Sequence, residues 1–316
     1  MKKALIIGIS GFVGGYLAKE LIDNGIEVYG ADIKKGELND NIKFIRINLL
    51  EQESIINALS DIRPDFIINL AAISSVKGSW DMPDVTFDVN VKGVINLFEA
   101  IRKVNLKSRV LLIGSSEQYG KITQGEKVDE EYALNALNPY GISKITQEKL
   151  AMMYKETYGI DVILVRAFNH TGPKQALGFV VPDFAKQIAE LEMLNKEPVM
   201  YVGNLKAERD ISDVRDIVKG YYALLIKGRS GEIYNIGSGT AHSMEYLLNS
   251  LIKLSSKKIS VEIDEKKFRP VDTPRIVCNN DKIITDTGWK PEISIDKTLL
   301  DSYIYWKNII IDENKA

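Results

Sequence analysis

Short apolar runs alternate with longer amphipathic stretches through the first half of the chain. The runs have the length of buried strands and lie at residues 3–8, 27–32, 42–47, 66–70, 110–113 and 162–166. The stretches between them repeat apolar residues at helical spacing and lie at about residues 17–25, 51–59, 85–104 and 143–158. Strands separated by helix-length segments predict an α/β fold, a doubly wound parallel sheet with helices on both faces.

Beyond Ala167 this alternation loosens. The pattern there predicts a loop at 169–173, a helix at 181–194, a strand at 198–202, a polar loop at 203–210, a helix at 213–225 and a strand at 233–236. The remainder predicts a helix near 243–254, a strand near 259–263 and a C-terminal helix from about 295. We expect residues 1–168 with about 211–237 to form the sheet domain, and 169–210 with 238–316 to form a smaller, discontinuous C-terminal lobe.

The composition is that of an ordinary soluble protein. Of 316 residues 45% are hydrophobic and the net charge is −2. No apolar run approaches the roughly 18 residues of a membrane span. Lysine and acidic residues are interspersed, which gives no basic stripe for nucleic acid. The N-terminal Met-Lys-Lys leads straight into a strand without a cleavage site, so we expect a cytoplasmic protein that binds neither membrane nor nucleic acid.

Cysteine and histidine are scarce. Cys278 is the only cysteine, which excludes an internal disulfide, and two histidines leave little room for a metal site or a His-centred triad. We therefore expect no bound metal. His170 is predicted to be a structural residue of its loop, and His242 an exposed residue at a helix start.

Three glycines separate the first strand from the first helix. Gly8, Gly11 and Gly14 form Gly-x-x-Gly-x-x-Gly, a turn that lets the backbone approach a pyrophosphate at the positive end of a helix. This context predicts a Rossmann dinucleotide-binding domain. Asp32 ends the second strand, where a carboxylate accepts hydrogen bonds from the adenosine ribose and favours NAD. Lys34–Lys35 follow it and are the alternative, a site for the 2′-phosphate of NADP.

A Tyr-x-x-x-Lys pair lies at the start of a long amphipathic run. On a helix Tyr140 and Lys144 share one face, and an ammonium group favours the phenolate, which lowers the pKa of a phenol from about 10 toward neutrality. Ser115, Ser116 and Glu117 follow a strand, where doubly wound sheets bind ligands. Either serine could donate a hydrogen bond to a carbonyl oxygen while Tyr140 delivers a proton. The alternatives are a chance pair on a surface helix and a serine cap at a strand end.

Two basic-acidic pairs occur in the predicted lobe. Arg209 precedes Asp210, and Arg269 lies three residues before Asp272. Such pairs are commonly solvated surface pairs. A lobe that faces a dinucleotide fold also needs cations if its substrate carries a diphosphate, and arginine provides that geometry best.

Along nearly its full length the chain resembles the extended short-chain dehydrogenase/reductase family. The resemblance rests on Gly8, Gly11, Gly14 and on residues 69–72, 90–93, 114–120 and 138–144. It implies a catalytic Ser115, because this serine lies four residues before Tyr119, with Tyr140 and Lys144. The implied cofactor contacts are Gly8, Gly11, Phe12, Val13, Gly14, Asp32, Asn48, Leu49, Leu70, Ala71, Ala72, Asn90, Tyr140 and Lys144. It also implies a homodimer through a four-helix interface of residues 85–104 and 143–158.

A finer resemblance is to the members that act on GDP-4-keto-6-deoxy-mannose. It rests on residues 74–80, 168–173, 177–180 and 202–205, on Arg209-Asp210 and on Arg269-Pro270. The implied substrate contacts are Ser74, Ser75, Ser115, Glu117, Asn169, Phe179, Lys186, Asn204, Arg209 and Arg269.

The finer resemblance implies reduction of the C4 ketone to GDP-rhamnose with NAD(P)H. Glu117 stands at the place of the acid of the GDP-mannose 4,6-dehydratases, so a dehydratase or epimerase with tightly bound NAD is the alternative. Ser115 stands where those dehydratases usually carry Thr, the 169–173 loop looks like the reductases, and an extra arm of the tetrameric dehydratases is missing. Asp32 departs from an NADPH-preferring pattern. A non-catalytic dinucleotide-binding protein need not keep Ser115, Tyr140 and Lys144 together.

Overall fold

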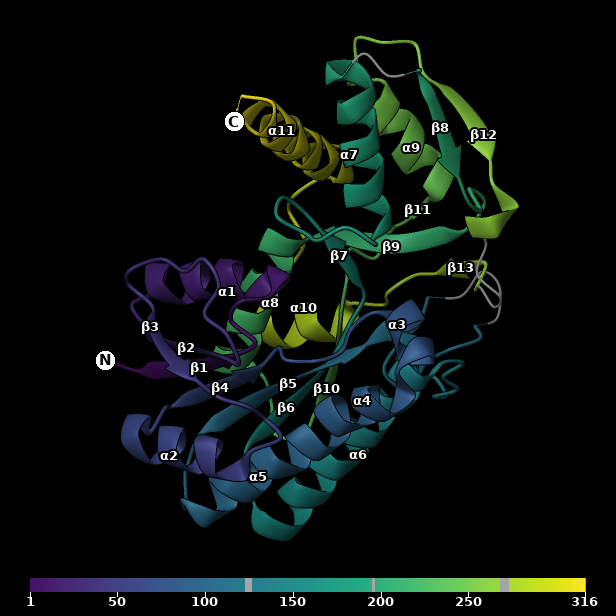
Figure 1. Cartoon of the computed structure of the whole chain (residues 1–316). Coiled ribbons are helices and arrows are strands. Elements are labelled where there is room, and N and C mark those ends of the chain that lie inside the picture. The colour runs from purple at the N-terminus through teal and green to yellow at the C-terminus, as the bar shows by residue number, and fades with distance from the viewer. Residues whose placement is uncertain (123–126, 195–196, 268–272, 316) are drawn as a thin grey trace.

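The computed structural model describes residues 1–122, 127–194, 197–267 and 273–315. A parallel sheet with helices on both faces forms the larger part, and a lobe of short strands and helices lies above one edge of it (Figure 1). Along the described chain no helix combines the length and the apolar character needed to cross a bilayer.

The main sheet has seven strands, all parallel, in the order β10-β6-β5-β4-β1-β2-β3. Its strands are β1 (Lys3–Ile7), β2 (Glu27–Asp32), β3 (Lys43–Arg46), β4 (Phe66–Asn69), β5 (Arg109–Ser115), β6 (Val162–Ala167) and β10 (Ile233–Ile236). Ile7 pairs with Asn69, and Asn69 with Leu112, so β1, β4 and β5 end at the same edge. This is the predicted doubly wound arrangement, in which ligands bind at the carboxyl ends of the strands.

Helices cover both faces of this sheet. One face carries α1 (Phe12–Asp23), α8 (Val214–Lys227) and α10 (Asp281–Thr287), and the other carries α2 (Gln52–Ile62), α5 (Gly93–Lys103) and α6 (Pro139–Tyr158). The chain reaches α5 through α3 (Val76–Asp81), α4 (Pro83–Phe87) and the π-helical turn η1 (Asp88–Lys92). The short 3-10 helix η2 (Ser116–Gln118) follows β5 directly.

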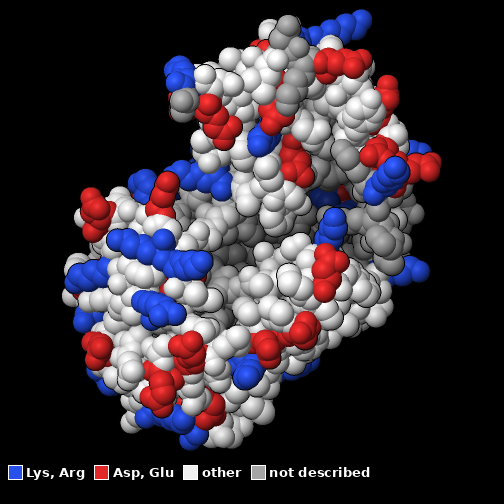
Figure 2. Space-filling view, viewed as in Figure 1, with Lys and Arg blue, Asp and Glu red and all other residues white. Residues whose placement is uncertain are grey.

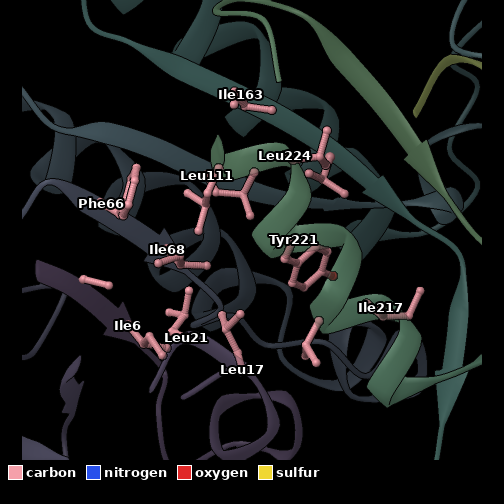
Figure 3. Close-up of a cluster of buried hydrophobic side chains, with 14 of the residues drawn as sticks. Ile6, Leu17, Leu21, Phe66, Ile68, Leu111, Ile163, Ile217, Tyr221 and Leu224 are labelled. Atoms are coloured by element: carbon pink, nitrogen blue, oxygen red, sulfur yellow. The ribbon is translucent and has the colours of Figure 1, made fainter. Parts of the chain in front are cut away.

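A continuous apolar cluster holds α1 and α8 against the sheet (Figure 3). Ile68 and Leu111 point from the strands toward Leu17 of α1 and Tyr221 of α8, and all four side chains are buried. Burying an aliphatic or aromatic side chain of this size contributes about 1.5–3 kcal/mol. The cluster therefore fixes the start of α1, and with it the glycine turn, relative to the strand ends.

The lobe is built around β9 (Glu208–Asp213). β7 (Asn169–Thr171) and β13 (Arg275–Ile276) pair with it in parallel and β11 (Ala241–Ser243) antiparallel. β8 (Val199–Val202) and β12 (Ser260–Ile263) form a separate parallel pair, and η3 (Glu265–Lys267) follows. The helices α7 (Val180–Met193), α9 (Met244–Ile252) and α11 (Ile295–Glu313) enclose the apolar core of the lobe.

Three local predictions in the lobe are wrong. Asn169 to Thr171 is strand rather than loop, and so is Glu208 to Asp210. His242 lies in β11, half-buried, with its ring stacked on Tyr246 at 4.9 Å, and the helix begins after it at Met244. These strands are polar and short, so no apolar alternation marks them. Pairing with neighbours that are distant in sequence forms them instead.

The division of the chain between the two parts stays a prediction, which two observations refine. Residues 211–213 complete the lobe strand β9, so the return to the sheet domain begins with α8. α10 contacts α8 and β10, and Ile283 and Trp289 belong to the core of the sheet domain. Residues from α10 to Trp289 therefore belong with the sheet rather than with the lobe.

Candidate active site

The glycine turn between β1 and α1 has no room for side chains. Gly8 has φ +87°, and a Cβ there would lie 2.7 Å from the amide nitrogen of Ala71. A Cβ on Gly14 would lie 2.1 Å from the carbonyl oxygen of Ile9. Gly11 precedes α1 without a capping side chain, so the first amides of the helix are available to an anion. The turn has the form that a pyrophosphate requires.

A pocket beside this turn unites residues from separate strands. Its lining includes Gly8 after β1, Asp32 of β2, Asn48 and Leu49 after β3, and Ala71 after β4. Five of the predicted cofactor contacts thus border one pocket. Its wall is largely apolar apart from Asp32 and Asn48, which suits an adenosine group.

Asp32 also braces the glycine turn. Its Oδ2 accepts a hydrogen bond from the amide of Ser10 at 3.1 Å, and its Oδ1 accepts one from the amide of Ile33 at 2.8 Å. The Ser10 hydroxyl donates to the carbonyl oxygen of Lys34 at 2.9 Å. A carboxylate oxygen has more than one lone pair, so Asp32 can still accept from a ribose hydroxyl.

The helix that carries Tyr140 begins at a well-defined cap. Asn138 accepts a hydrogen bond from the amide of Gly141 at 2.8 Å through Oδ1, and Pro139 is the first helical residue. A Cβ on Gly141 would lie 2.6 Å from the carbonyl oxygen of Glu117. Gly141 therefore lets the start of α6 lie directly on the loop after β5, beside Ser115.

Tyr140 and Ser115 meet at this contact. Tyr140 is 8% exposed, and burial raises its pKa to about 12, with a hydrogen bond to Ser115 opposing the shift and the charge of Glu117 adding to it. The Ser115 hydroxyl oxygen accepts from the amide of Glu117 at 3.2 Å. The prediction that Lys144 brings the pKa of the phenol toward neutrality is wrong, because burial raises that pKa. Tyr140 holds its proton.

Lys144 lies one turn further along α6 and is equally buried. Its Nζ is 5.8 Å from the centre of the Tyr140 ring, and it donates to the carbonyl oxygen of Ile113 at 2.8 Å and to Oε1 of Gln147 at 3.2 Å. Burial lowers its pKa to about 7. At pH 7 the amine is therefore protonated in only about half of the molecules.

Glu117 and Ser116 complete the loop after β5. The Glu117 carboxylate is half-buried, accepts a hydrogen bond from Nδ2 of Asn138 at 2.8 Å and lies close enough to Tyr140 to affect its pKa. Ser116 is buried, and its hydroxyl forms no hydrogen bond within the described structure. The geometry thus favours Ser115 over Ser116 as the partner of Tyr140.

Asn90 holds the helices of the site together. Its Oδ1 accepts from the amide of Ile73 at 2.8 Å, and its Nδ2 donates to the hydroxyl of Ser143 at 2.9 Å and to the carbonyl oxygen of Ile73 at 3.1 Å. The side chain is buried and engaged within the protein. Its observed role is to tie α6 to the π-helical turn, while a cofactor contact stays a prediction.

Four of the predicted substrate contacts come from elements of the lobe. Arg209 lies on β9, where its Nη1 donates to the carbonyl oxygen of Glu208, and Asn169 is an exposed residue of the neighbouring strand β7. Phe179 is 41% exposed just before α7. Asn204 accepts from the amide of Lys206 at 3.0 Å. In the space-filling view the surface is hollowed between the lobe and the sheet domain (Figure 2).

Four other predicted substrate contacts are Lys186, Ser74, Ser75 and Arg269. The Nζ of Lys186 lies 3.6 Å from Oε1 of Glu190 and 5.5 Å from the ring centre of Trp306, so its ammonium is engaged within the lobe. Ser75 caps α3 by accepting from the amide of Gly78, and Ser74 beside it is exposed. Arg269 lies outside the described residues.

Asp210 is not a surface partner of Arg209. It is 1% exposed and accepts hydrogen bonds from the amide and hydroxyl of Ser238 and from the amides of Gly239 and Cys278. Burial raises its pKa, and these hydrogen bonds oppose the shift. It ties the lobe strand β9 to the turn that follows β10. The surface-pair interpretation is therefore wrong for this residue.

His170 is structural, but it lies on a strand rather than in a loop. Its Nδ1 is 3.0 Å from the carbonyl oxygen of Phe168, and its ring stacks on Phe12 with 6.2 Å between centres and 9° between planes. Burial lowers its pKa, so the imidazole is neutral near pH 7. Phe12, predicted to contact the cofactor, is thereby supported from the lobe.

Two residues of the site were missed by the sequence interpretation. Asn138 caps α6 and binds Glu117, and an Asn-Pro pair before an amphipathic run is a recognisable helix start. Gln147 donates to the carbonyl oxygen of Ile113 and accepts from Lys144, three residues before it, which is the spacing of neighbours on one helix face. Within the described residues no group of three or more His, Cys, Asp or Glu side chains could hold a metal ion.

The chain is similar to known proteins over almost its whole length. GDP-6-deoxy-D-mannose reductase of Pseudomonas aeruginosa is 28% identical over 99% of this chain and 99% of the relative. GDP-mannose 4,6 dehydratase 2 of Arabidopsis thaliana is 28% identical over 94% of this chain and 84% of the relative. The solved structure of RMD from Pseudomonas aeruginosa complexed with NADPH has a TM-score of 0.86 and 29% identity, covering 98% of this chain and 100% of the other.

A family model described as GDP-mannose 4,6 dehydratase matches residues 5–301. The match spans both the sheet domain with its glycine turn and the lobe, so it concerns the whole site and not the dinucleotide fold alone. This chain belongs to that family, among the extended short-chain dehydrogenases/reductases that act on nucleotide sugars.

Proposed function

We propose that this protein reduces the C4 ketone of GDP-4-keto-6-deoxy-mannose to give GDP-rhamnose, with NADH or NADPH as the reductant. The observation that carries the proposal is the placement of Tyr140 beside the end of β5: its phenol is buried at the start of α6, where Gly141 packs against the carbonyl oxygen of Glu117, two residues after Ser115. A protonated acid is what ketone reduction requires of this residue. A relative named GDP-6-deoxy-D-mannose reductase matches the chain from end to end.

The residues present fit a nicotinamide dinucleotide. The turn of Gly8, Gly11 and Gly14 with the start of α1 would hold the pyrophosphate, and Asp32 would accept from the adenosine ribose. Lys144 would hold the nicotinamide ribose. When bound in reduced form, this cofactor supplies the hydride that the protein itself cannot.

The protein's own contribution is to polarise the ketone and to deliver a proton. The Ser115 hydroxyl oxygen already accepts a hydrogen bond from the amide of Glu117, so its hydrogen is free to donate to the ketone oxygen. Tyr140 gives its proton to the alkoxide that develops there. A protonated Lys144 would stabilise the phenolate left behind, and stabilisation of charge at these oxygens is typically the largest catalytic effect.

The lobe would bind the nucleotide part of the substrate. Arg209 and Arg269 would pair with the diphosphate, since arginine forms bidentate hydrogen bonds with phosphate. Asn169, Asn204 and Phe179 are the proposed contacts to the sugar and the base.

A second candidate is a GDP-mannose 4,6-dehydratase. Glu117 favours it, because its carboxylate lies beside Tyr140 and is held there by Asn138. Elimination of water needs a second acid–base group beside the tyrosine, and Glu117 is placed to act as one.

One assay separates the two activities. We would incubate the purified protein with GDP-4-keto-6-deoxy-mannose and NADH or NADPH, and separately with GDP-mannose without added cofactor, and identify the products by NMR. The proposal expects cofactor oxidation and GDP-rhamnose in the first reaction and no product in the second. A 4-keto product from GDP-mannose alone would overturn it in favour of the dehydratase.

A further inference from the structure

A buried amide lies directly behind Ser115. The side chain of Gln118 folds back over η2, where its Oε1 accepts a hydrogen bond from the amide of Ser115 at 2.9 Å. Its Nε2 donates to Oε2 of Glu148 on α6 at 2.9 Å. Gly114 makes room for this arrangement, because a Cβ there would lie 2.4 Å from Oε1 of Gln118. The amide therefore links the end of β5 to α6.

The partner of this amide is a buried ion pair. Glu148 receives two hydrogen bonds from Arg166 of β6, at 2.8 Å from Nε and 2.7 Å from Nη2, and both side chains are at most 5% exposed. Arg166 also donates to the hydroxyl of Tyr119 and to the carbonyl oxygen of Glu130. A carboxylate paired in this way presents only acceptors to Gln118. The charge of Glu148 thus fixes which end of the Gln118 amide faces Ser115.

We propose that Gln118 is a positioning residue for Ser115, held in orientation by the Glu148–Arg166 pair. The inference deepens the proposed function, on which it rests. Gln118 fixes the amide of Ser115, while the amide of Glu117 fixes the Ser115 hydroxyl oxygen. Together they leave the hydroxyl hydrogen to point at Tyr140 or the ketone. Only a neutral group with a donor on one side and an acceptor on the other satisfies both neighbours.

Gln118→Glu tests this requirement with little change in size. At pH 8 the new carboxylate faces the Glu148 carboxylate, and the two repel. We expect kcat for ketone reduction to fall about tenfold or more, the size of loss that small misplacements of catalytic groups produce, with the substrate KM unchanged. As the pH is lowered to 6, one of the two carboxyl groups takes up a proton and donates to the other, so the ratio of variant to wild-type kcat should rise.

Other ionisable groups near residue 118 could also titrate between pH 6 and pH 8. Arg166 faces Glu148 from β6, Tyr119 neighbours it, and the Glu130 carboxylate accepts from the amide of Asn235. Burial raises the pKa of Glu130 and lowers that of Lys144, which donates to the carbonyl oxygen of Ile113 on β5, to about 7, so both groups must be controlled for. The wild-type pH profile supplies that control. Gln52→Glu supplies a second, since Gln52 lies on α2 and pairs with Lys103, where a new carboxylate meets a lysine and no effect of pH on the kcat ratio is expected.

Exchanging the two groups provides a rescue. In the double variant Gln118→Glu with Glu148→Gln, the charge of the cluster is that of the wild type, and an amide again faces a carboxylate. We expect its kcat at pH 8 to exceed that of Gln118→Glu. If Gln118→Glu lowers stability but leaves kcat and its pH profile as in the wild type, or if the exchange rescues stability alone, the positioning role is wrong.

Hydrogen exchange of the Ser115 amide measures how well its hydrogen bond to Gln118 protects it, and the measurement needs no substrate. Gln118→Met removes the acceptor with little change in volume, so exchange at Ser115 should accelerate about tenfold or more relative to the rest of β5. An unchanged rate would overturn the proposal. If the wild type does not reduce the 4-keto sugar, the proposed function fails, while this measurement still decides the role of Gln118.

Discussion

Nδ2 of Asn138 donates a hydrogen bond to Oε2 of Glu117 at 2.8 Å, while Oδ1 of Asn138 caps α6 at the amide of Gly141. One side chain thus sets both the start of the tyrosine helix and the position of the acid beside Tyr140. The bond keeps Glu117 at the site whether or not its carboxylate takes part in the chemistry.

Glu117→Gln separates a chemical role of this carboxylate from a structural one. Glutamine can still accept from Asn138, so the loop should keep its position. If the protein is a reductase, kcat for the 4-keto sugar should stay within about threefold of the wild type, because Tyr140 and Ser115 supply the proton and the polarisation. A loss of about a hundredfold or more in dehydration of GDP-mannose would instead identify Glu117 as the acid–base group of a dehydratase.

Tyr140→Phe removes the proposed proton donor. General acid catalysis typically contributes about a hundredfold or more, so kcat should fall by that factor while cofactor binding, followed by fluorescence titration, changes little. Tyr154→Phe is the matched control, since Tyr154 is a buried tyrosine of the same helix whose hydroxyl bonds to Glu99. Near-normal turnover of Tyr140→Phe would remove this residue from the mechanism.

Lys144 should lower the free energy of unfolding at neutral pH, compared with an apolar residue at the same position. Its folded pKa is about 7, below the unfolded value of 10.5, so between these values the unfolded chain binds more protons and stability rises with pH. Below pH 7 Lys144 is protonated in both the folded and the unfolded state, so the full destabilisation by burial of its charge is present. Lys144→Met should therefore raise the free energy of unfolding at pH 7, by at most about 5 kcal/mol for the pKa difference between 10.5 and about 7, at about 1.4 kcal/mol per pKa unit.

Urea unfolding at pH 7 and pH 9.5 checks this effect of Lys144. The stabilisation by Lys144→Met should be smaller at the higher pH, although the variant should have little activity at either. Lys149→Met, at an exposed position of the same helix, should show no such dependence on pH. A gain at pH 9.5 as large as at pH 7 would mean that packing, and not the charge, is responsible.

Asp32 should set the preference between the two cofactors. Its carboxylate borders the pocket beside the glycine turn, where it would repel the 2′-phosphate of NADPH. Asp32→Asn keeps an acceptor for the amide of Ser10 and removes the charge. The ratio of kcat/KM for NADH to that for NADPH should fall about tenfold, which corresponds to about 1.4 kcal/mol.

Alanine at both Lys34 and Lys35 tests the opposing charges. If these lysines hold the 2′-phosphate, their removal should weaken use of NADPH and leave NADH use near the wild-type level. Equal losses for both cofactors would show that the loop, rather than its charge, had been disturbed.

The helix that carries Tyr140 and the glycine turn could be predicted because each depends on particular residues at fixed spacing. Gly8 and Gly14 meet backbone atoms that exclude any side chain, and the Tyr140–Lys144 spacing is one helical turn. The strands β1, β4 and β5 are short apolar runs, and the structure confirms them. These features are local, so the sequence alone specifies them.

The remaining features depend on contacts between distant segments. β9 contains the polar residues Glu208 to Asp210 and exists because β7, β11 and β13 pair with it. The high pKa of Tyr140 follows from its burial, which spacing on a helix cannot reveal. The role of Gln118 could not be predicted from the sequence for the same reason, since its partner Glu148 is thirty residues further along the chain.

The outer face of α6 predicts how two copies of the chain would associate. Ile142 and Met153 are 46% and 47% exposed and lie eleven residues apart, three helical turns, so they share one stripe. α4 contacts α6 and adds the exposed Val85 and Phe87. Apolar side chains clustered in this way on a surface typically mark an interface, which supports the homodimer expected for residues 85–104 and 143–158.

Met153→Glu should break this dimer. A charge placed in the stripe would lose its hydration on association, so the mass measured by light scattering at micromolar concentration should fall from that of two chains to that of one. Ile304→Glu introduces the same charge at an equally exposed isoleucine of α11, outside the proposed interface, and should leave the mass unchanged. A wild-type protein that is already monomeric would show that this interface does not form. A dimer that survives Met153→Glu but not Ile304→Glu would place the interface elsewhere. Because Ser115 and Tyr140 lie within one chain, the monomeric variant should keep the proposed ketone reductase activity.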